Sequence, residues 1–153
     1  MKLSVIAVGE IRDFRLRELC EEYRGRLDHH LQTADVSVKK GRDPRRAQVM
    51  AEEAQSLRGA TPDGALTVAM TEEGKKISSM EVAQQLDQWM VEGRSDIAFY
   101  IGGANGLDYQ LRRTATKRWS LSPMTFPHDV ARMLLWEQLY RAMTIIRNEP
   151  YHK

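Results

Sequence analysis

Two segments rich in glycine and proline have the residue types of a ligand-binding loop. The first, Ile101-Gly-Gly-Ala-Asn-Gly106, directly follows an apolar run that reads as a buried strand. Glycine permits positive φ angles and leaves room for a ligand against bare backbone, and ligands of open α/β sheets bind at the carboxyl ends of strands. A tight turn without any ligand has the same composition, so this segment alone is a weak signal.

The second segment is Leu121-Ser-Pro-Met-Thr-Phe-Pro-His128. Its two prolines stiffen the chain, and its peptide groups cannot all pair in a strand ladder, which leaves some of them to bind a polar ligand such as an adenine edge. Taken singly, Met124 and Phe126 are equally well explained as core residues. A third strand end, Val68-Ala-Met-Thr-Glu72, precedes both segments. We expect the three strand ends to converge on one ligand.

Four titratable or aromatic residues are candidates for removing a proton or positioning a substrate: His128, Glu137, Tyr151 and His152. A tail that ends in an aromatic ring, an imidazole and a lysine has the groups that stack on an unpaired nucleobase and hold it. The alternatives are that His128 caps a helix or bonds a buried carbonyl, and that the tail is a frayed terminus.

Other common chemistries lack their motifs. A dinucleotide-binding turn needs Gly-x-Gly-x-x-Gly after the first strand, but only Val8-Gly9-Glu10 stands there. The Gly74-Lys-Lys76 stretch lacks the upstream glycine and the Ser or Thr of a phosphate-binding loop. The histidines and the single cysteine show no ligand spacing, so no metal is expected. Cys20 reads as a small buried hydrophobe.

Strand-like and helix-like segments alternate along the whole chain, which predicts an α/β fold with a mainly parallel sheet flanked by helices. The expected strands are 2–8, 34–38, 65–70, 96–101 and a short piece at 119–121. The expected helices are 15–27, 45–57, 79–91 and 129–147. Ser78 and Glu81 have the spacing of a helix N-terminal cap. The sharpest boundary is Thr61-Pro-Asp-Gly64, which divides an N-terminal extension, 1–64, from a core, 65–153, within one domain and one sheet.

The expected last helix carries apolar residues over an arc too wide for one core-facing stripe. Burial on two sides follows. Either a partner subunit covers the second side, or the helix lies centrally within one monomer.

The composition is that of a folded globular chain, with 153 residues, 42% of them hydrophobic, and a net charge of +2. The apolar runs are too short to cross a bilayer, the N-terminus lacks the features of a secretion signal, and one cysteine permits no internal disulfide. The cytoplasm is the expected compartment. Two basic clusters are either phosphate-contacting surfaces or solvated faces: Lys39, Lys40, Arg42, Arg45 and Arg46, and Arg112, Arg113, Lys117 and Arg118.

Four motifs in order resemble one family. They are Ile101 to Gly106, Leu121 to His128, Glu137-Gln-Leu-Tyr-Arg-Ala142 and the terminal Pro150-Tyr-His-Lys153, and the opening Met1 to Gly9 agrees as well. The chain resembles, over its whole length, the bacterial large-subunit rRNA pseudouridine-N3 methyltransferases (RlmH type) of the SPOUT class.

The resemblance implies a C-terminal trefoil knot, an obligate homodimer and methylation of a pseudouridine at N3 in 23S rRNA of the ribosome, with S-adenosylmethionine as cofactor. It places the cofactor-binding positions at Met70, Gly102, Gly103, Leu121, Ser122, Pro123, Met124, Thr125 and Phe126. Met70 stands where the family often has Leu, which keeps an apolar contact of similar volume. The resemblance also favours a substrate role for the tail, which reaches across the dimer.

Two other functions stay open at this point. One is a non-catalytic ribosome-binding or assembly factor that uses the basic clusters as its contact surface, against which the glycine and proline loops count. The other is a SPOUT methyltransferase that acts on tRNA, which the terminal Pro-Tyr-His-Lys disfavours.

Overall fold

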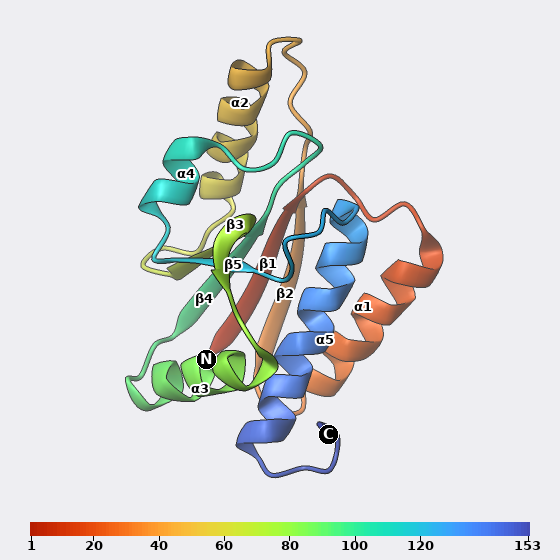
Figure 1. The fold of residues 1–153 in the computed structure, drawn as a ribbon, viewed down its shortest axis with the longest axis vertical. Coiled ribbons are helices and arrows are strands. Elements are labelled where there is room, and N and C mark those ends of the chain that lie inside the picture. Colours follow the sequence, from red (N-terminus) through yellow and green to blue (C-terminus); the bar gives the residue numbers. More distant parts are fainter.

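The computed structural model describes residues 1–153 and has one sheet between two layers of helices (Figure 1). The elements follow in the order β1 (Lys2–Val8), α1 (Phe14–Leu27), β2 (Gln32–Val38), α2 (Arg46–Gly59), β3 (Leu66–Lys76), α3 (Ser79–Val91), β4 (Asp96–Ile101), α4 (Tyr109–Thr114), β5 (Lys117–Ser120) and α5 (His128–Ile146).

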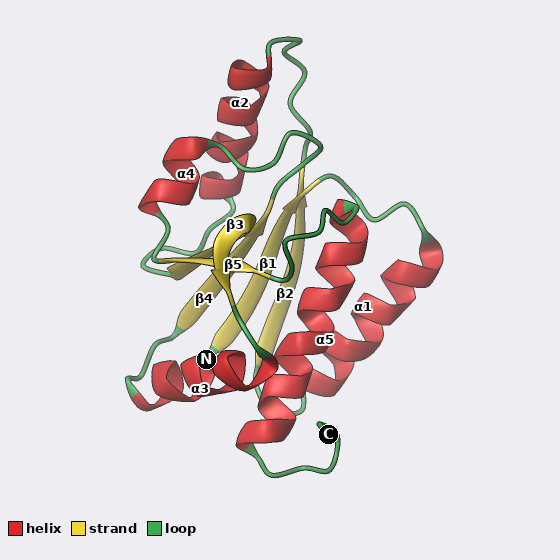
Figure 2. Ribbon diagram, in the orientation of Figure 1, coloured by secondary structure: helices red, strands yellow, loops and turns green.

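The five strands form one sheet in the order β2-β1-β4-β3-β5 (Figure 2). Every strand pairing is parallel, and β1 pairs with both β2 and β4, so strands from the first 64 residues and from the rest of the chain share one sheet. The predicted α/β architecture with a parallel sheet is therefore confirmed. Because helices cover both faces, the central strands β1 and β4 read as nearly continuous apolar runs.

The side chains of β1 divide between two cores. Leu3, Val5 and Ala7 point into a cluster built with α1, α3 and α5 on one face of the sheet. Ile6 and Val8 point into a second cluster built with α2 and α4 on the other. The carboxyl ends of the strands thus lie between α2 and α4 on one side and the start of α5 on the other (Figure 1).

Most predicted elements agree with the structure to within a few residues, and 2–8, 79–91 and 96–101 agree at both ends. The predicted cap of α3 is confirmed, because Ser78 and Glu81 form a reciprocal capping box. Cys20 is buried as expected, and burial raises the pKa of its thiol to about 12. No helix has the length and apolar character needed to span a membrane.

One helix and half of one strand were missed. α4 has six residues, too few for a periodic pattern, and begins where the Asp108 carboxylate accepts hydrogen bonds from the backbone N–H groups of Gln110 and Leu111. β3 continues beyond the predicted Met70 through a bulge, since Met70 and Lys75 both pair with Trp119. The bulge, residues 71–74, carries charged side chains that concealed the strand.

Gly74 makes this bulge possible. A Cβ atom at residue 74 would lie 2.8 Å from the backbone carbons of Arg118 and Trp119. Real Cβ atoms do not approach backbone so closely, and the bulge can press against β5 only because residue 74 has no side chain.

α5 is buried on two sides within the single chain, because it packs against α1 and α3 as well as the sheet. Leu135, Trp136 and Leu139 are at most 2% exposed, so Leu139 belongs to the core of one chain. Met133 and Tyr140 are only partly buried. The apolar surface that α5 leaves for another molecule is thus narrower than the sequence arc suggests.

Gly74→Ala should lower the free energy of unfolding by about 1–3 kcal/mol, because the new methyl group overpacks the contact between the bulge and β5. Urea denaturation measures the change. Gly25→Ala is the matched control, since a Cβ at Gly25 in α1 meets nothing within 4 Å and should stabilise the helix by up to about 1 kcal/mol. Equal shifts in the two variants would contradict the role given to Gly74.

Candidate functional site

A cavity of about 390 Å³ lies at the carboxyl ends of β4 and β5 and beside the bulge of β3, and we call it the strand-end cavity. It has the size of a small-molecule site, for which about 300–1,000 Å³ is usual. The residues predicted to bind the cofactor that line it are Met70, Gly102, Leu121, Ser122, Met124 and Phe126. Gly103, Pro123 and Thr125 are not among its lining residues. The structure therefore brings together the three segments that the sequence singled out, although the first of them lies at the bulge of β3 and not at its end.

The glycine loop after β4 folds against its own backbone. A Cβ at Gly102 would lie 2.6 Å from the backbone carbon of Gly106. The Gly106 N–H donates to the Gly103 carbonyl at 3.0 Å, and Gly106 has φ +81°. Gly103 faces away from the cavity, where its Cβ position is 3.1 Å from Val8 and 3.3 Å from the Glu53 carboxylate. Gly102 thus presents backbone to the cavity, while Gly103 seats the loop on the sheet.

The segment between β5 and α5 forms the opposite wall. The Ser120 hydroxyl donates to the Ser122 carbonyl at 2.9 Å, and the Ser122 hydroxyl accepts from the Met124 N–H at 3.0 Å. Phe126 is half-buried beside the cavity, whereas the Met124 side chain is 71% exposed. Because the two serines fix the turn, the backbone of this wall is held without help from a ladder.

Arg132 anchors the start of α5, a role that was not predicted from the sequence. Its side chain is 3% exposed and pairs with Asp35 of β2, from Nε to Oδ1, at 2.8 Å. Its two terminal nitrogens donate to the Ser37 hydroxyl at 2.9 Å and the Gly9 carbonyl at 3.2 Å. One guanidinium therefore ties α5 to the ends of β1 and β2. An isolated arginine inside an apolar arc was the only available signal.

His128 stands one helical turn before this anchor and lines the strand-end cavity. Its Nε2 atom is buried without a hydrogen-bond partner, 3.6 Å from the position of a Cβ on Gly9. No side chain caps the start of α5, so the alternative of a capping role is not seen. A buried polar atom without a partner is unusual and is available to a ligand or a water molecule.

The other three candidates lie at the far end of α5. The Tyr151 hydroxyl donates to Glu137 at 3.1 Å, and the Arg141 Nε donates to the same carboxylate at 3.0 Å. Nη1 of Arg141 lies 3.2 Å from Nδ1 of His152. Burial and the Glu137 carboxylate raise the pKa of the Tyr151 hydroxyl. The tail is docked on its own helix and not frayed.

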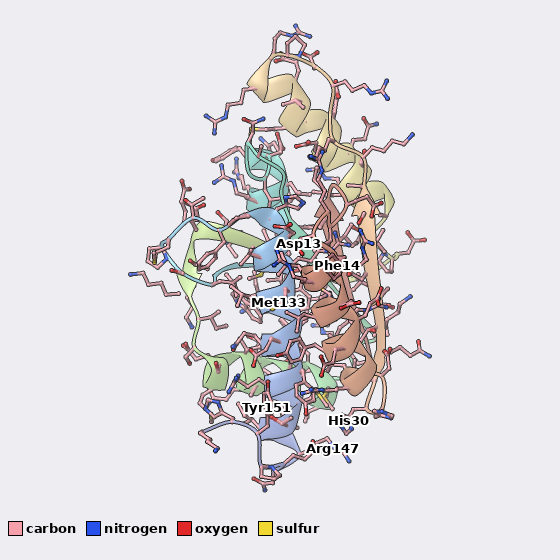
Figure 3. All side chains as sticks on the ribbon, turned by 90° about the vertical axis from the view of Figure 1, so that its right-hand side faces the viewer. Asp13, Phe14, His30, Met133, Arg147 and Tyr151 are labelled. Atoms are coloured by element: carbon pink, nitrogen blue, oxygen red, sulfur yellow. The ribbon has the colours of Figure 1, made fainter.

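This tail cluster does not line the strand-end cavity of its own chain. Glu137 is nine residues after His128, about 14 Å along a helix that rises about 1.5 Å per residue. Figure 3 shows Tyr151 beside the lower part of α5, whereas His128 is the first residue of that helix. His128 is thus separated from the other three candidates within one chain.

A second and larger cavity, of about 820 Å³, runs along the β5 edge of the sheet, and we call it the edge groove. It lies between the outer part of β3, α3, α4 and β5. It shares Thr71, Glu73 and Arg112 with the strand-end cavity. The edge groove is open and mainly polar, so the smaller cavity, with its glycine loop and apolar wall, has the better form for a compact ligand.

A family model described as "Predicted SPOUT methyltransferase" matches residues 1–152. Proteins named ribosomal RNA large subunit methyltransferase H are similar over the full length. The one from Dinoroseobacter shibae is 43% identical and the one from Dechloromonas aromatica 39%, each covering 100% of this chain and 99% of the relative.

Solved structures agree in fold. The match to a probable methylase family protein from Haemophilus influenzae covers 99% of this chain and 70% of that protein's chain, with a TM-score of 0.54 and 14% sequence identity. The match to TrmJ from Z. mobilis covers 100% of this chain and 73% of the TrmJ chain, with a TM-score of 0.53 and 13% sequence identity. At these identities the likeness concerns the fold alone.

Replacing the anchor should unfold the chain more readily. Arg132→Met leaves Asp35 buried without its partner, and we expect a loss of about 3–5 kcal/mol in the free energy of unfolding. Arg94→Met is the matched control, since its pair with Glu92 is exposed and is worth about 0–1 kcal/mol. The double variant Arg132→Met/Asp35→Leu should recover part of the loss. Similar losses for the two arginines in chemical denaturation would show that Arg132 is no anchor.

Proposed function

The chain belongs to the SPOUT methyltransferase family, and from this premise we propose that it transfers a methyl group from S-adenosylmethionine to ribosomal RNA of the large subunit. The acceptor is N3 of a pseudouridine in 23S rRNA, and the reaction takes place in the cytoplasm. One observation supports this most. Two segments that carry the family resemblance, Ile101 to Gly106 and Leu121 to His128, line a single cavity of ligand size together with Met70.

The strand-end cavity fits the proposed cofactor. S-adenosylmethionine supplies an electrophilic methyl group on a sulfonium centre. Gly102 offers bare backbone with no space for a side chain, and Met70, Leu121 and Phe126 offer apolar surface. The peptide groups of residues 121–126 lie outside any strand ladder, and those other than the Ser122 carbonyl and the Met124 N–H are suited to an adenine edge. We assign the cofactor-binding role to these residues, with Gly103, Pro123 and Thr125 as backbone that holds the loops in place.

The residues around the cavity act mainly by positioning. Holding the acceptor nitrogen in line with the methyl group removes a large entropic cost. N3 of a uracil-type ring carries a proton that must leave before or during attack. Of the four candidates, only His128 lines the cavity of the same chain. Its Nε2 is buried without a hydrogen-bond partner, so its role is to orient a water that takes the proton, and not to contact the substrate directly. Glu137, Tyr151 and His152 then act on the substrate bound at the cavity of the other subunit.

A substrate role for the tail requires a homodimer. The tail is docked at the end of a 19-residue helix whose first residue lines the cavity, and such a helix is about 28 Å long. Only a second copy can bring Tyr151 and His152 near that cavity. The face formed by α1 and α5 suits such a contact, because Phe14 is 63% exposed and lies on the same face as Met133 and Tyr151 (Figure 3).

We also propose the trefoil knot and the division into a 1–64 extension and a 65–153 core. The supporting observation is that α5 follows edge strand β5 yet packs against α1, beyond the centre of the sheet. The connecting segment 121–127 crosses beside the loop after β4, with which it shares the strand-end cavity. A chain trace from an experimental structure tests the threading.

Deletion of residues 151–153 tests the proposed function. The truncated protein should bind S-adenosylmethionine and dimerise as the full chain does, because neither needs the tail. Methylation of ribosomes should fall about ten- to hundred-fold, the equivalent of about 1–3 kcal/mol of lost base stacking. Tyr151→Phe is the matched control, since it removes only the hydrogen bond to Glu137 and keeps the ring.

Calorimetry measures cofactor binding, light scattering measures dimerisation, and incorporation of a labelled methyl group measures methylation. Full activity of the truncated protein would make the tail a bystander, and lost cofactor affinity would place it in the cofactor site. A full chain that neither binds the cofactor nor methylates any RNA would favour the assembly factor. Methylation of tRNA alone would favour the SPOUT methyltransferase that acts on tRNA.

A further inference from the structure

The edge groove is a surface that the proposed cofactor site does not use. We propose that it binds the single-stranded rRNA next to the methyl acceptor, with Arg113 and Lys117 contacting phosphates and Tyr109 stacking on a base. The proposal rests on the proposed function, because it assigns a path to the substrate of that site.

The groove leads directly to the strand-end cavity. The two share Thr71 and Glu73 from the β3 bulge and Arg112 from α4. The bulge is held in place by Gly74, whose backbone lies against β5. A base that must enter the cavity has to leave its stack, and the strand beside it is then unpaired. The groove begins where that strand would continue.

The cations along the groove differ in what they are free to bind. Nη1 of Arg118 donates to the carbonyls of Arg112 at 3.0 Å and Ala115 at 3.3 Å, so Arg118 caps the end of α4. Lys75 pairs with Glu81 at 3.2 Å, and Arg112 pairs with Glu73 at 3.0 Å.

Arg113 and Lys117 are exposed, line the groove and have no carboxylate partner. They are therefore the two cations that can bind phosphate without giving up an existing ion pair or hydrogen bond. Phosphate contacts of this kind supply much of the affinity of nucleic-acid binding.

An aromatic ring stands beside these cations. Tyr109 is 61% exposed at the start of α4, and the Arg112 guanidinium lies 5.9 Å from its ring centroid. Opposite, α3 presents the amides of Gln84, Gln85 and Gln88. Cations along the backbone with an exposed ring between them are the usual means of binding a single strand, and side-chain amides can reach base edges.

The other basic cluster fits the role less well. Arg45 is held by Asp43 through two hydrogen bonds, at 2.8 and 3.0 Å. Arg46 lines the strand-end cavity, but no other member of that cluster lines either cavity. The geometry therefore favours the groove over the loop before α2 as the path of the strand.

The test compares two double variants that each remove two positive charges. Arg113→Gln/Lys117→Gln alters the groove, and Arg58→Gln/Arg94→Gln alters exposed arginines that line neither cavity. Binding of a short uridine-rich RNA strand is followed by fluorescence anisotropy at several salt concentrations, and the KM for ribosomes is measured in parallel.

The groove variant should bind the RNA strand about ten-fold more weakly than the control variant. Its slope of log affinity against log salt should fall by about 0.7 for each lost phosphate contact. Its KM for ribosomes should rise while kcat and cofactor affinity stay unchanged. Tyr109→Ala should weaken binding about five-fold or more, whereas Tyr109→Phe should not.

Equal RNA affinity and equal salt slopes in the two double variants would overturn the proposal. Tighter binding of a duplex of the same sequence would overturn its single-strand part. Weaker binding of ribosomes with unchanged binding of the RNA strand would assign the groove to a ribosomal protein. Because the anisotropy needs no methyl transfer, failure of the groove is distinguishable from failure of the methyltransferase function, which would show as no methylation by the wild-type chain.

Discussion

The ion pair between Arg132 and Asp35 is the contact on which the position of the site depends. Both side chains are at most 10% exposed, and the guanidinium also bonds to Ser37 and the Gly9 carbonyl. Burying these charges is costly, and the cost is offset only because each guanidinium nitrogen has an acceptor. The pair fixes where α5 begins, and the helix start in turn fixes His128 and the segment 121–127. Loss of that anchor should loosen the wall that faces the loop after β4.

Two glycines, Gly102 and Gly74, also fix the position of loops at the site, because each lets two backbone segments approach closely. Gly102 lets the loop after β4 close on Gly106, and Gly74 lets the β3 bulge press against β5. Neither has a positive φ, so close approach is what requires glycine at both positions. The first contact shapes the strand-end cavity. The second places Thr71 and Glu73 between that cavity and the edge groove, so that the proposed cofactor site and the proposed RNA path adjoin there.

The elements predicted correctly from the sequence are those with a clear local pattern. β1, β4 and α3 have long apolar runs or a clear cap, and their bounds were predicted correctly. α4 and the outer half of β3 were missed, because one is shorter than two helical turns and the other is held by a glycine contact across strands. Contacts between residues far apart in the sequence were not predicted either. Nothing local marks Arg132 as the partner of Asp35, and nothing local separates Tyr151 and His152 from His128.

Hydrogen–deuterium exchange with and without S-adenosylmethionine tests the central claim most directly, namely that the strand-end cavity is the cofactor site. Peptides that cover residues 101–107 and 121–127 should exchange more slowly at a saturating cofactor concentration, because their amides become bonded or shielded. Peptides from α3, along the edge groove, should exchange at an unchanged rate. Protection confined to residues 74–88 and 109–118, with none at the glycine loop, would contradict the account.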